Sequence, residues 1–123
     1  MKQKITIVGA GLSGSLLCIF LARRGFQVDV YERRPDMRKV SISAGKSINL
    51  ALSARGIHAL QQVGLAEKVL ENAVPMKGRM IHDAKGELSF LPYGKNDSEF
   101  INSISRSGLN SILMNEAEKY PDV

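Results

Sequence analysis

A glycine-rich turn between a strand pattern and a helix pattern constrains this chain more than any other stretch. Residues 4–8 are a short apolar run typical of a buried strand, and residues 9–14 read Gly-Ala-Gly-Leu-Ser-Gly. A helical stripe follows over residues 13–24, and a second strand around 28–30 leads to the acid Glu32. This order of strand, glycine turn, helix, strand and acid is typical of the βαβ unit that binds a dinucleotide.

Each residue type in the turn has a physical role in that interpretation. Gly9 allows the tight turn out of the strand, Gly11 lets a pyrophosphate approach the backbone, and Gly14 lets the helix pack close to the sheet. The helix N-terminus adds free N–H groups and the positive end of its dipole. Glu32, 23 residues after Gly9, is where an acid that accepts a hydrogen bond from a ribose is expected. A purely structural glycine turn is the alternative interpretation.

The residues around the acid bear on which nucleotide is bound. Arg33 and Arg34 are compatible with the 2′-phosphate of NADP, whereas Glu32 would repel that phosphate. A ribose with a free 2′-hydroxyl, as in NAD or FAD, therefore fits better. The basic stretch over residues 33–47 is interpreted for most of its positions as a solvated loop.

Composition excludes several other classes of protein. A chain of 123 residues with 44% hydrophobic residues is expected to be one soluble domain. The net charge of +5 comes without aromatic–basic interleaving, so no nucleic-acid partner is expected. No apolar run approaches the roughly 20 residues of a membrane span, and the N-terminus enters a strand directly, so we expect a cytoplasmic protein. The single cysteine, Cys18, is interpreted as a small buried apolar residue, and no metal site is expected.

The second half of the chain changes from a βαβ pattern to an antiparallel one. Such a change predicts a sheet inserted into the nucleotide domain, which can cover a substrate pocket. The chain then stops just after a helical pattern, which predicts a truncation of something longer. The predicted elements are an extended segment at 47–53, a helix capped by Ser53, a short helix at 65–73, hairpin strands at 76–84 and 87–93 around a Lys85-Gly86 turn, a strand at 100–105 that returns to the sheet, and a helix from Ser107.

Two arginines in this half are candidates for ligand contacts. Arg79 and Tyr93 lie one on each hairpin strand, and a turn at 85–86 allows both to share a face. Together they can hold a carboxylate, by a charged fork and a hydroxyl; a surface cation and a packed ring are the alternative. Arg106 lies between a strand end and a helix start, where open α/β sheets present ligand contacts. His58 and His82 are interpreted as surface or packing residues.

Four blocks of the sequence together resemble the FAD-dependent aromatic hydroxylases. They are residues 46–56 (KSINLALSARG), 75–82 (PMKGRMIH), 91–94 (LPYG) and 103–106 (SISR). The resemblance covers essentially the whole chain but only the N-terminal part of those enzymes, whose second flavin motif is missing here. It implies a Rossmann-like FAD-binding α/β domain over residues 1–123, with 75–105 contributing to an inserted antiparallel substrate-binding β-sheet.

The resemblance also implies a set of site residues. Arg79 and Tyr93, fourteen residues apart, match the family's pair for the substrate carboxylate, and Arg55 is placed near the isoalloxazine. No catalytic acid or base is expected among these residues. The implied FAD contacts are Gly9, Gly11, Ser13, Gly14, Tyr31, Glu32, Arg33, Arg34, Ala51 and Arg106.

The implied reaction is hydroxylation of L-kynurenine to 3-hydroxykynurenine, with FAD as cofactor and NADPH and O2 as co-substrates. In such chemistry the flavin carries out the reaction, and the protein supplies position and charge. Two alternatives stay open. One is a related flavin hydroxylase acting on another aromatic acid, and the other is a non-catalytic nucleotide-binding fragment.

Overall fold

The structure, a computed structural model, describes residues 1–40 and 49–123. The chain divides into two compact units, one made of residues 1–48 and 106–123 and the other of residues 49–105. Both contain helices and strands, as the predicted α/β class requires. The parts of the predictions that fall on residues 41–48, such as the start of the extended segment, lie outside the described residues.

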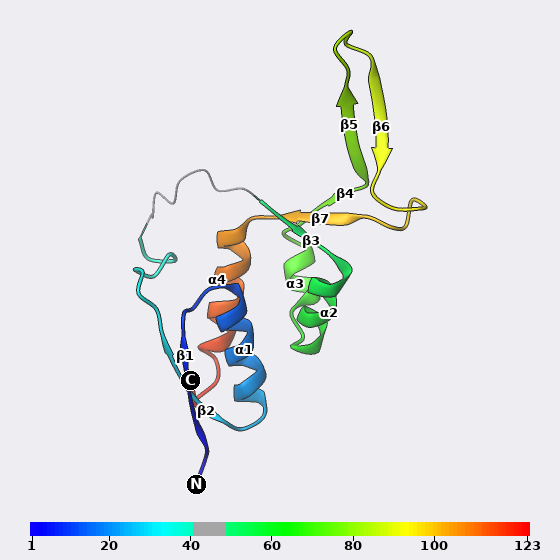
Figure 1. The fold of residues 1–123 in the computed structure, drawn as a ribbon. Helices are drawn as coiled ribbons and strands as arrows, with labels where there is room; N and C mark the ends of the chain where they lie inside the picture. Colours follow the sequence, from blue (N-terminus) through cyan, green and yellow to red (C-terminus); the bar gives the residue numbers. More distant parts are fainter. Residues whose placement is uncertain (41–48) are drawn as a thin grey trace. The chain divides into compact units, whose positions relative to one another are not determined.

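The first unit is a βαβ unit with a second helix packed against it. β1 (Lys4–Val8) and β2 (Gln27–Tyr31) pair in parallel along their whole length. α1 (Leu12–Arg23) connects them, and α4 (Arg106–Ala117) lies beside α1 (Figure 1). The three predicted elements of the βαβ unit are therefore confirmed, with ends shifted by one or two residues.

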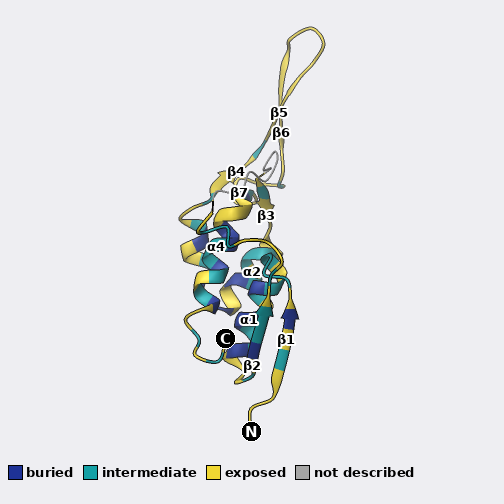
Figure 2. Cartoon of the chain, turned by 90° about the vertical axis from the view of Figure 1, so that its left-hand side faces the viewer, coloured by how far each residue is buried: buried dark blue, intermediate teal, exposed yellow. Residues whose placement is uncertain are grey.

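Apolar side chains from the two helices and β2 form the core of this unit. Ile19, Val28 and Leu113 are 0%, 1% and 2% exposed, and Figure 2 shows buried stretches along α1. Cys18 is fully buried among them, and burial raises the pKa of its thiol. The prediction that Cys18 is a small buried residue is confirmed.

The second unit contains a three-stranded antiparallel sheet. β7 (Ile101–Ile104) is its central strand, between β3 (Leu50–Leu52) and β4 (Val74–Met76). Between β3 and β4 the chain forms α2 (Ala54–Gln62) and α3 (Ala66–Leu70). The predicted strand at 100–105 is confirmed as β7, and the sheet that it joins is separate from that of the βαβ unit.

β4 is a strand that the sequence did not predict. Pro75 lies in its middle, opposite Asn102 of β7, and proline has no N–H to donate to a ladder. β4 is at the edge of its sheet, the position where a strand tolerates proline. The proline correctly ended the preceding helix pattern but concealed the short strand after it.

The predicted hairpin forms, with slightly shorter strands. β5 (Gly78–His82) pairs with β6 (Leu88–Pro92), from Gly78↔Pro92 to His82↔Leu88. The Asp83 carboxylate closes the turn by accepting hydrogen bonds from the N–H groups of Lys85 and Glu87, both at 2.8 Å. Gly86, at φ +83°, supplies the left-handed residue that this turn needs. Most side chains of the hairpin are exposed (Figure 2).

The two predicted serine caps are only partly confirmed. Ser53 occupies the N-cap of α2 with an extended backbone, but its side chain makes no cap hydrogen bond. α4 begins at Arg106, one residue before the predicted Ser107. None of the helices in the described part of the chain combines the length and hydrophobicity that crossing a bilayer requires.

Candidate cofactor site

The glycine turn is fastened to the end of β2 by two hydrogen bonds. The Gly9 N–H donates to the Tyr31 carbonyl at 2.7 Å, and the Ala10 N–H donates to the Glu32 carboxylate at 2.9 Å. Gly9 has φ +109°, in the region that side chains other than hydrogen rarely adopt. The turn is therefore held in one conformation by its hydrogen bonds to Tyr31 and Glu32 and by the backbone conformation that Gly9 permits.

Gly11 and Gly14 have different surroundings, and these match the roles expected for them. A Cβ on Gly14 would lie 1.9 Å from the Gly9 carbonyl oxygen, so only glycine lets α1 start this close to the turn. A Cβ on Gly11 would meet no atom within 4 Å. The open space at Gly11 fits a pyrophosphate approaching the backbone, whereas Gly14 serves the packing of the turn.

The N-terminus of α1 faces the open space beside Gly11 and is suited to binding an anion. Its N-cap is Gly11, no side chain caps it, and its first turn contains no acid. Ser13 is exposed in that first turn. Backbone N–H groups and the helix dipole therefore act on the space beside Gly11 without a competing carboxylate from the helix.

Glu32 joins the turn to the loop that follows β2. One carboxylate oxygen accepts from Ala10, and the other accepts from the Arg34 N–H at 2.9 Å and more distantly from its Nε at 3.4 Å. These bonds, first that of the Arg34 N–H and then that of Ala10, lower the Glu32 pKa to about 2. The carboxylate is thus ionised at neutral pH, keeps lone pairs for a ribose hydroxyl, and repels a 2′-phosphate.

A groove of about 630 Å³ runs from the turn along β2 to α4. It combines charged residues near Glu32 with apolar side chains deeper inside. Its lining includes Ala10, Ser15, Cys18, Val28, Tyr31, Glu32, Arg34, Met37, Met114 and Ala117.

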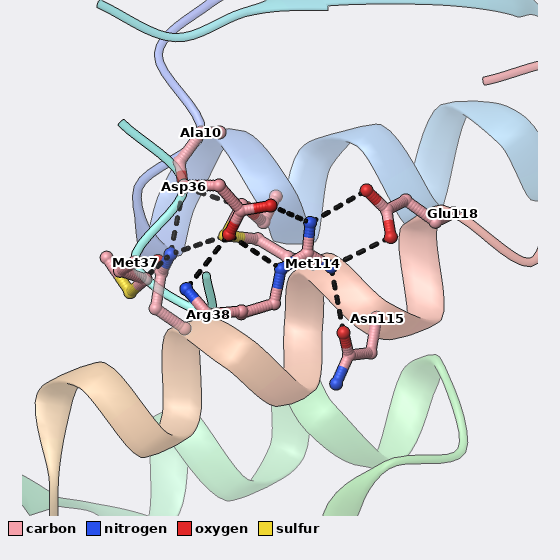
Figure 3. Close-up of polar contacts among 9 residues, drawn as sticks. Ala10, Asp36, Met37, Arg38, Met114, Asn115 and Glu118 are labelled. Carbon is pink, nitrogen blue, oxygen red and sulfur yellow. Dashed lines mark hydrogen bonds and ion pairs between the residues drawn. The ribbon is translucent and has the colours of Figure 1, made fainter. Parts of the chain in front are cut away.

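The loop that forms one wall of the groove is attached to α4 by Arg38 (Figure 3). Its guanidinium donates to both oxygens of Asp36, at 2.9 and 2.7 Å, and to both oxygens of Glu118, at 2.8 Å each. It also donates to the side-chain Oδ1 of Asn115 at 2.8 Å. Arg38 lowers the pKa of Asp36 to about 2 and lowers that of Glu118. With its side chain only 17% exposed, Arg38 is not part of a solvated loop, and that interpretation is wrong for this residue.

The other predicted cofactor residues of this unit lie around the turn with exposed side chains. Tyr31 ends β2, and Arg33 and Arg34 follow on the loop, with Arg34 lining the groove. Arg106 opens α4 four residues before Asn110, whose side-chain amide donates to the Ala10 carbonyl at 3.0 Å. Residues four apart share a helix face, so Arg106 lies on the face of α4 that meets the glycine turn.

The remaining predicted site residues belong to the second unit. Ala51 is exposed on β3 opposite Ser103, and Arg55 is exposed in the first turn of α2. Neither has a contact in the structure that assigns it to a cofactor.

Arg79 and Tyr93 share one face of the hairpin, as the sequence predicted. Arg79 is opposite Leu91, and the Tyr93 N–H donates to the Lys77 carbonyl at 2.9 Å, which extends the same register. Arg79 and Tyr93 are thus diagonal neighbours, a relation in which side chains of this length reach each other. His82 is exposed on the hairpin, and the exposed His58 contacts Gln62 at 3.1 Å.

Sequence reasoning missed two buried polar side chains that meet at the turn. Asn110 is 2% exposed and Ser15 is 3% exposed, and both donate to the Ala10 carbonyl, Ser15 at 3.1 Å. A signal existed for Asn110, because it lies three and seven residues before the buried Leu113 and Ala117. A polar residue on the apolar face of a helix points to a specific buried contact.

A βαβ unit with this turn, an ionised acid after its second strand and an uncapped helix start defines a dinucleotide-binding protein of the Rossmann-like class. A family model described as "FAD binding domain" matches residues 2–123. The chain belongs to this family, whose cofactor is FAD.

Several curated relatives carry the name kynurenine 3-monooxygenase. The chain is 59% identical to that of Myxococcus xanthus over 95% of its length, and 50% identical to that of Legionella pneumophila strain Corby over 98%. It is 49% identical to that of Sus scrofa over 98%. These alignments cover 25%, 27% and 26% of the relatives, so the chain spans about a quarter of their length.

Solved structures of two oxygenases share the fold. A p-nitrophenol 4-monooxygenase from Pseudomonas putida superposes with a TM-score of 0.76 at 19% identity, over 98% of this chain and 31% of that one. A 2-methyl-3-hydroxypyridine-5-carboxylic acid oxygenase gives 0.75 at 18% identity, over 98% and 30%. At this identity the likeness supports the fold alone.

Proposed function

We propose that this chain forms the N-terminal, nucleotide-binding part of an FAD-dependent monooxygenase that converts L-kynurenine into 3-hydroxykynurenine with NADPH and O2. The observation that carries the proposal is the 59% and 50% identity to kynurenine 3-monooxygenases over almost the entire chain. The geometry of the glycine turn supports the cofactor half of the proposal independently of those names.

The first unit would hold the adenosine and pyrophosphate end of FAD. Gly11 and the start of α1 receive the pyrophosphate, and the ionised Glu32 accepts from the ribose. When bound, FAD supplies the activation of O2 for transfer to an aromatic ring, using electrons from NADPH. The proposed contacts are Gly9, Gly11, Ser13, Gly14, Tyr31, Glu32, Arg33, Arg34, Ala51 and Arg106.

Arg79 and Tyr93 would hold the carboxylate of the amino-acid substrate. Their shared hairpin face allows one oxygen to accept from the guanidinium and the other from the phenol hydroxyl. Anchoring that end fixes the direction of the aromatic ring, which is what an oxygen transfer to one ring carbon requires. We propose accordingly that residues 1–123 form the N-terminal part of the FAD-binding domain, and that residues 75–105 contribute to its substrate-binding sheet.

Flavin spectroscopy and NADPH oxidation test this proposal together. The purified protein is expected to show the absorption spectrum of protein-bound FAD, and L-kynurenine is expected to perturb that spectrum. L-Kynurenine is also expected to stimulate NADPH oxidation more than a panel of other aromatic acids does. Stronger stimulation by another aromatic acid would identify that acid as the substrate in place of L-kynurenine. Absence of flavin binding would overturn the proposal as a whole.

The compartment stays a prediction. The cytoplasmic location expected from the sequence is checked by fractionating cells and following the protein by immunoblot.

A further inference from the structure

The Asn110 side chain reaches from the buried face of α4 to the backbone of the glycine turn. Its Nδ2 donates to the Ala10 carbonyl at 3.0 Å and lies 3.2 Å from the Met114 sulfur. These acceptors fix the orientation of the amide, because the opposite orientation would place Oδ1 against the Ala10 oxygen. The Asn110 Oδ1 is then buried and has no hydrogen-bond partner among the described residues.

The unpartnered oxygen makes Asn110 a poor choice for stability alone. A buried acceptor without a partner destabilises the folded state, and leucine would fill a similar shape without that cost. The Ala10 carbonyl would still have a donor, because the Ser15 hydroxyl contacts it at 3.1 Å. The reason for an asparagine here therefore lies in what its Nδ2 does to the turn.

The Ala10 carbonyl controls the direction of the next N–H group. It belongs to the same planar unit as the Gly11 N–H, and the described chain has no cis peptide bond. In a trans peptide the C=O and N–H point in opposite directions. Drawing the Ala10 oxygen toward α4 therefore aims the Gly11 N–H away from α4.

We propose that Asn110 is a positioning residue that aims the Gly11 N–H at the pyrophosphate of the cofactor. It acts through the Ala10–Gly11 peptide and does not itself touch the ligand. The Glu32 carboxylate holds the N–H of Ala10 on one side, and Asn110 holds its carbonyl on the other. The inference rests on the proposed use of this turn for FAD.

Two variants of the purified protein, freed of flavin, test the inference. Asn110→Leu is expected to weaken FAD binding about tenfold or more, the loss typical of one displaced hydrogen bond to a charged group, while leaving the thermal midpoint unchanged or raised. Asn110→Asp keeps the shape but removes the donor, and it is expected to weaken FAD binding similarly. ADP binding should fall with FAD binding in both variants, whereas adenosine binding, which uses no pyrophosphate, should not.

A matched control variant and the wild-type protein distinguish failure of this inference from failure of the proposed function. Gln61→Leu makes a similar amide-to-leucine change at an exposed position of α2 and should leave the ratio of ADP to adenosine affinity unchanged. Wild-type FAD affinity in both Asn110 variants would overturn the inference, as would equal losses for ADP and adenosine with a lowered thermal midpoint. Failure of the wild-type protein itself to bind FAD would instead overturn the proposed function.

Discussion

The glycine turn carries the residues proposed for the cofactor and the β5–β6 hairpin those proposed for the substrate, and the two are built in opposite ways. The turn is fixed by hydrogen bonds to other parts of the unit. Its N–H groups donate to Tyr31 of β2 and to the Glu32 carboxylate, and its Ala10 carbonyl accepts from Asn110 of α4. The hairpin is fixed by its own backbone ladder and by the Asp83 turn. Its proposed ligand residue Tyr93 is 47% exposed, whereas Asn110 behind the turn is 2% exposed.

This difference shows what each region contributes to binding. A turn whose N–H groups are held in place before the ligand arrives loses little freedom on binding, so its geometry can be read directly from the backbone. The register of the hairpin determines which side chains share a face, but long exposed side chains such as Arg79 are ordered by what they bind. We therefore expect substitutions in the turn to affect cofactor affinity, and stability as well where the residue is closely packed. Substitutions on the hairpin should affect substrate affinity alone.

The largest expected effect is that of Arg79→Ala on substrate affinity. The change should weaken L-kynurenine binding by ~2–5 kcal/mol, the range for removing one partner of a charge pair that becomes buried. Flavin content and thermal midpoint should stay as in the wild type. Titration of the flavin spectrum with L-kynurenine measures the affinity, and Lys85→Ala in the hairpin turn is the control cation. Unchanged affinity in Arg79→Ala would remove the hairpin from the substrate site.

Gly14→Ala is expected to produce the next largest effect, on stability. Its Cβ would lie 1.9 Å from the Gly9 carbonyl oxygen, a backbone atom that cannot move aside without shifting the turn. Overpacking of this kind costs about 1–3 kcal/mol, and the displaced turn should also lose FAD affinity. Denaturant unfolding and FAD titration measure the two effects.

Gly11→Ala is the matched control for that prediction. Its φ is −74°, and a Cβ there meets no atom within 4 Å, so the free energy of unfolding should change by less than about 0.5 kcal/mol. FAD affinity should nevertheless fall, since the methyl group occupies the space meant for the pyrophosphate. Equal destabilisation by the two substitutions would contradict the different roles assigned to the two glycines.

A smaller effect is expected from the protonation of Glu32. Its pKa is about 2 in the folded protein against an ordinary value of 4.5, so its bonds to Ala10 and Arg34 stabilise the folded state fully above pH 4.5. That contribution should be lost as the pH falls toward 2. The difference in unfolding free energy between wild type and Glu32→Gln should therefore shrink between pH 6 and pH 3. A difference that is constant across this range would show that the charge of Glu32 does not fasten the turn.

Local patterns were sufficient to predict the βαβ unit and the hairpin. The glycine positions, the acid after β2 and the Lys85-Gly86 turn each impose a backbone geometry on their immediate neighbours, and the structure has those geometries. The shared face of Arg79 and Tyr93 followed from counting residues on either side of the turn, because strand side chains alternate.

Contacts between distant residues could not be predicted in the same way. The pairing of β7 with β3 and β4, the Arg38–Glu118 bridge and the Asn110 contact to Ala10 join residues that are 25 to 100 positions apart in the sequence. Arg38 in particular is part of a charged run, and such runs are usually solvated; only the position of Glu118, in the turn directly after α4, makes it a bridge.

The smallest expected effect is that of Leu88→Ala in the hairpin, which is compared with the same change at Leu113 in the core of the first unit. Leu113 of α4 is 2% exposed and Leu88 of the hairpin is 61% exposed. Leu113→Ala should lower the free energy of unfolding by about 2–5 kcal/mol, because it leaves a cavity in the core. Leu88→Ala should change it by less than about 0.5 kcal/mol, since the side chain is already in contact with water. Denaturant unfolding of both variants measures the contrast. A loss at Leu88 that approaches the loss at Leu113 would mean that the apolar side of the hairpin is covered in the folded protein, which would end the distinction between a turn held by other elements and an exposed hairpin.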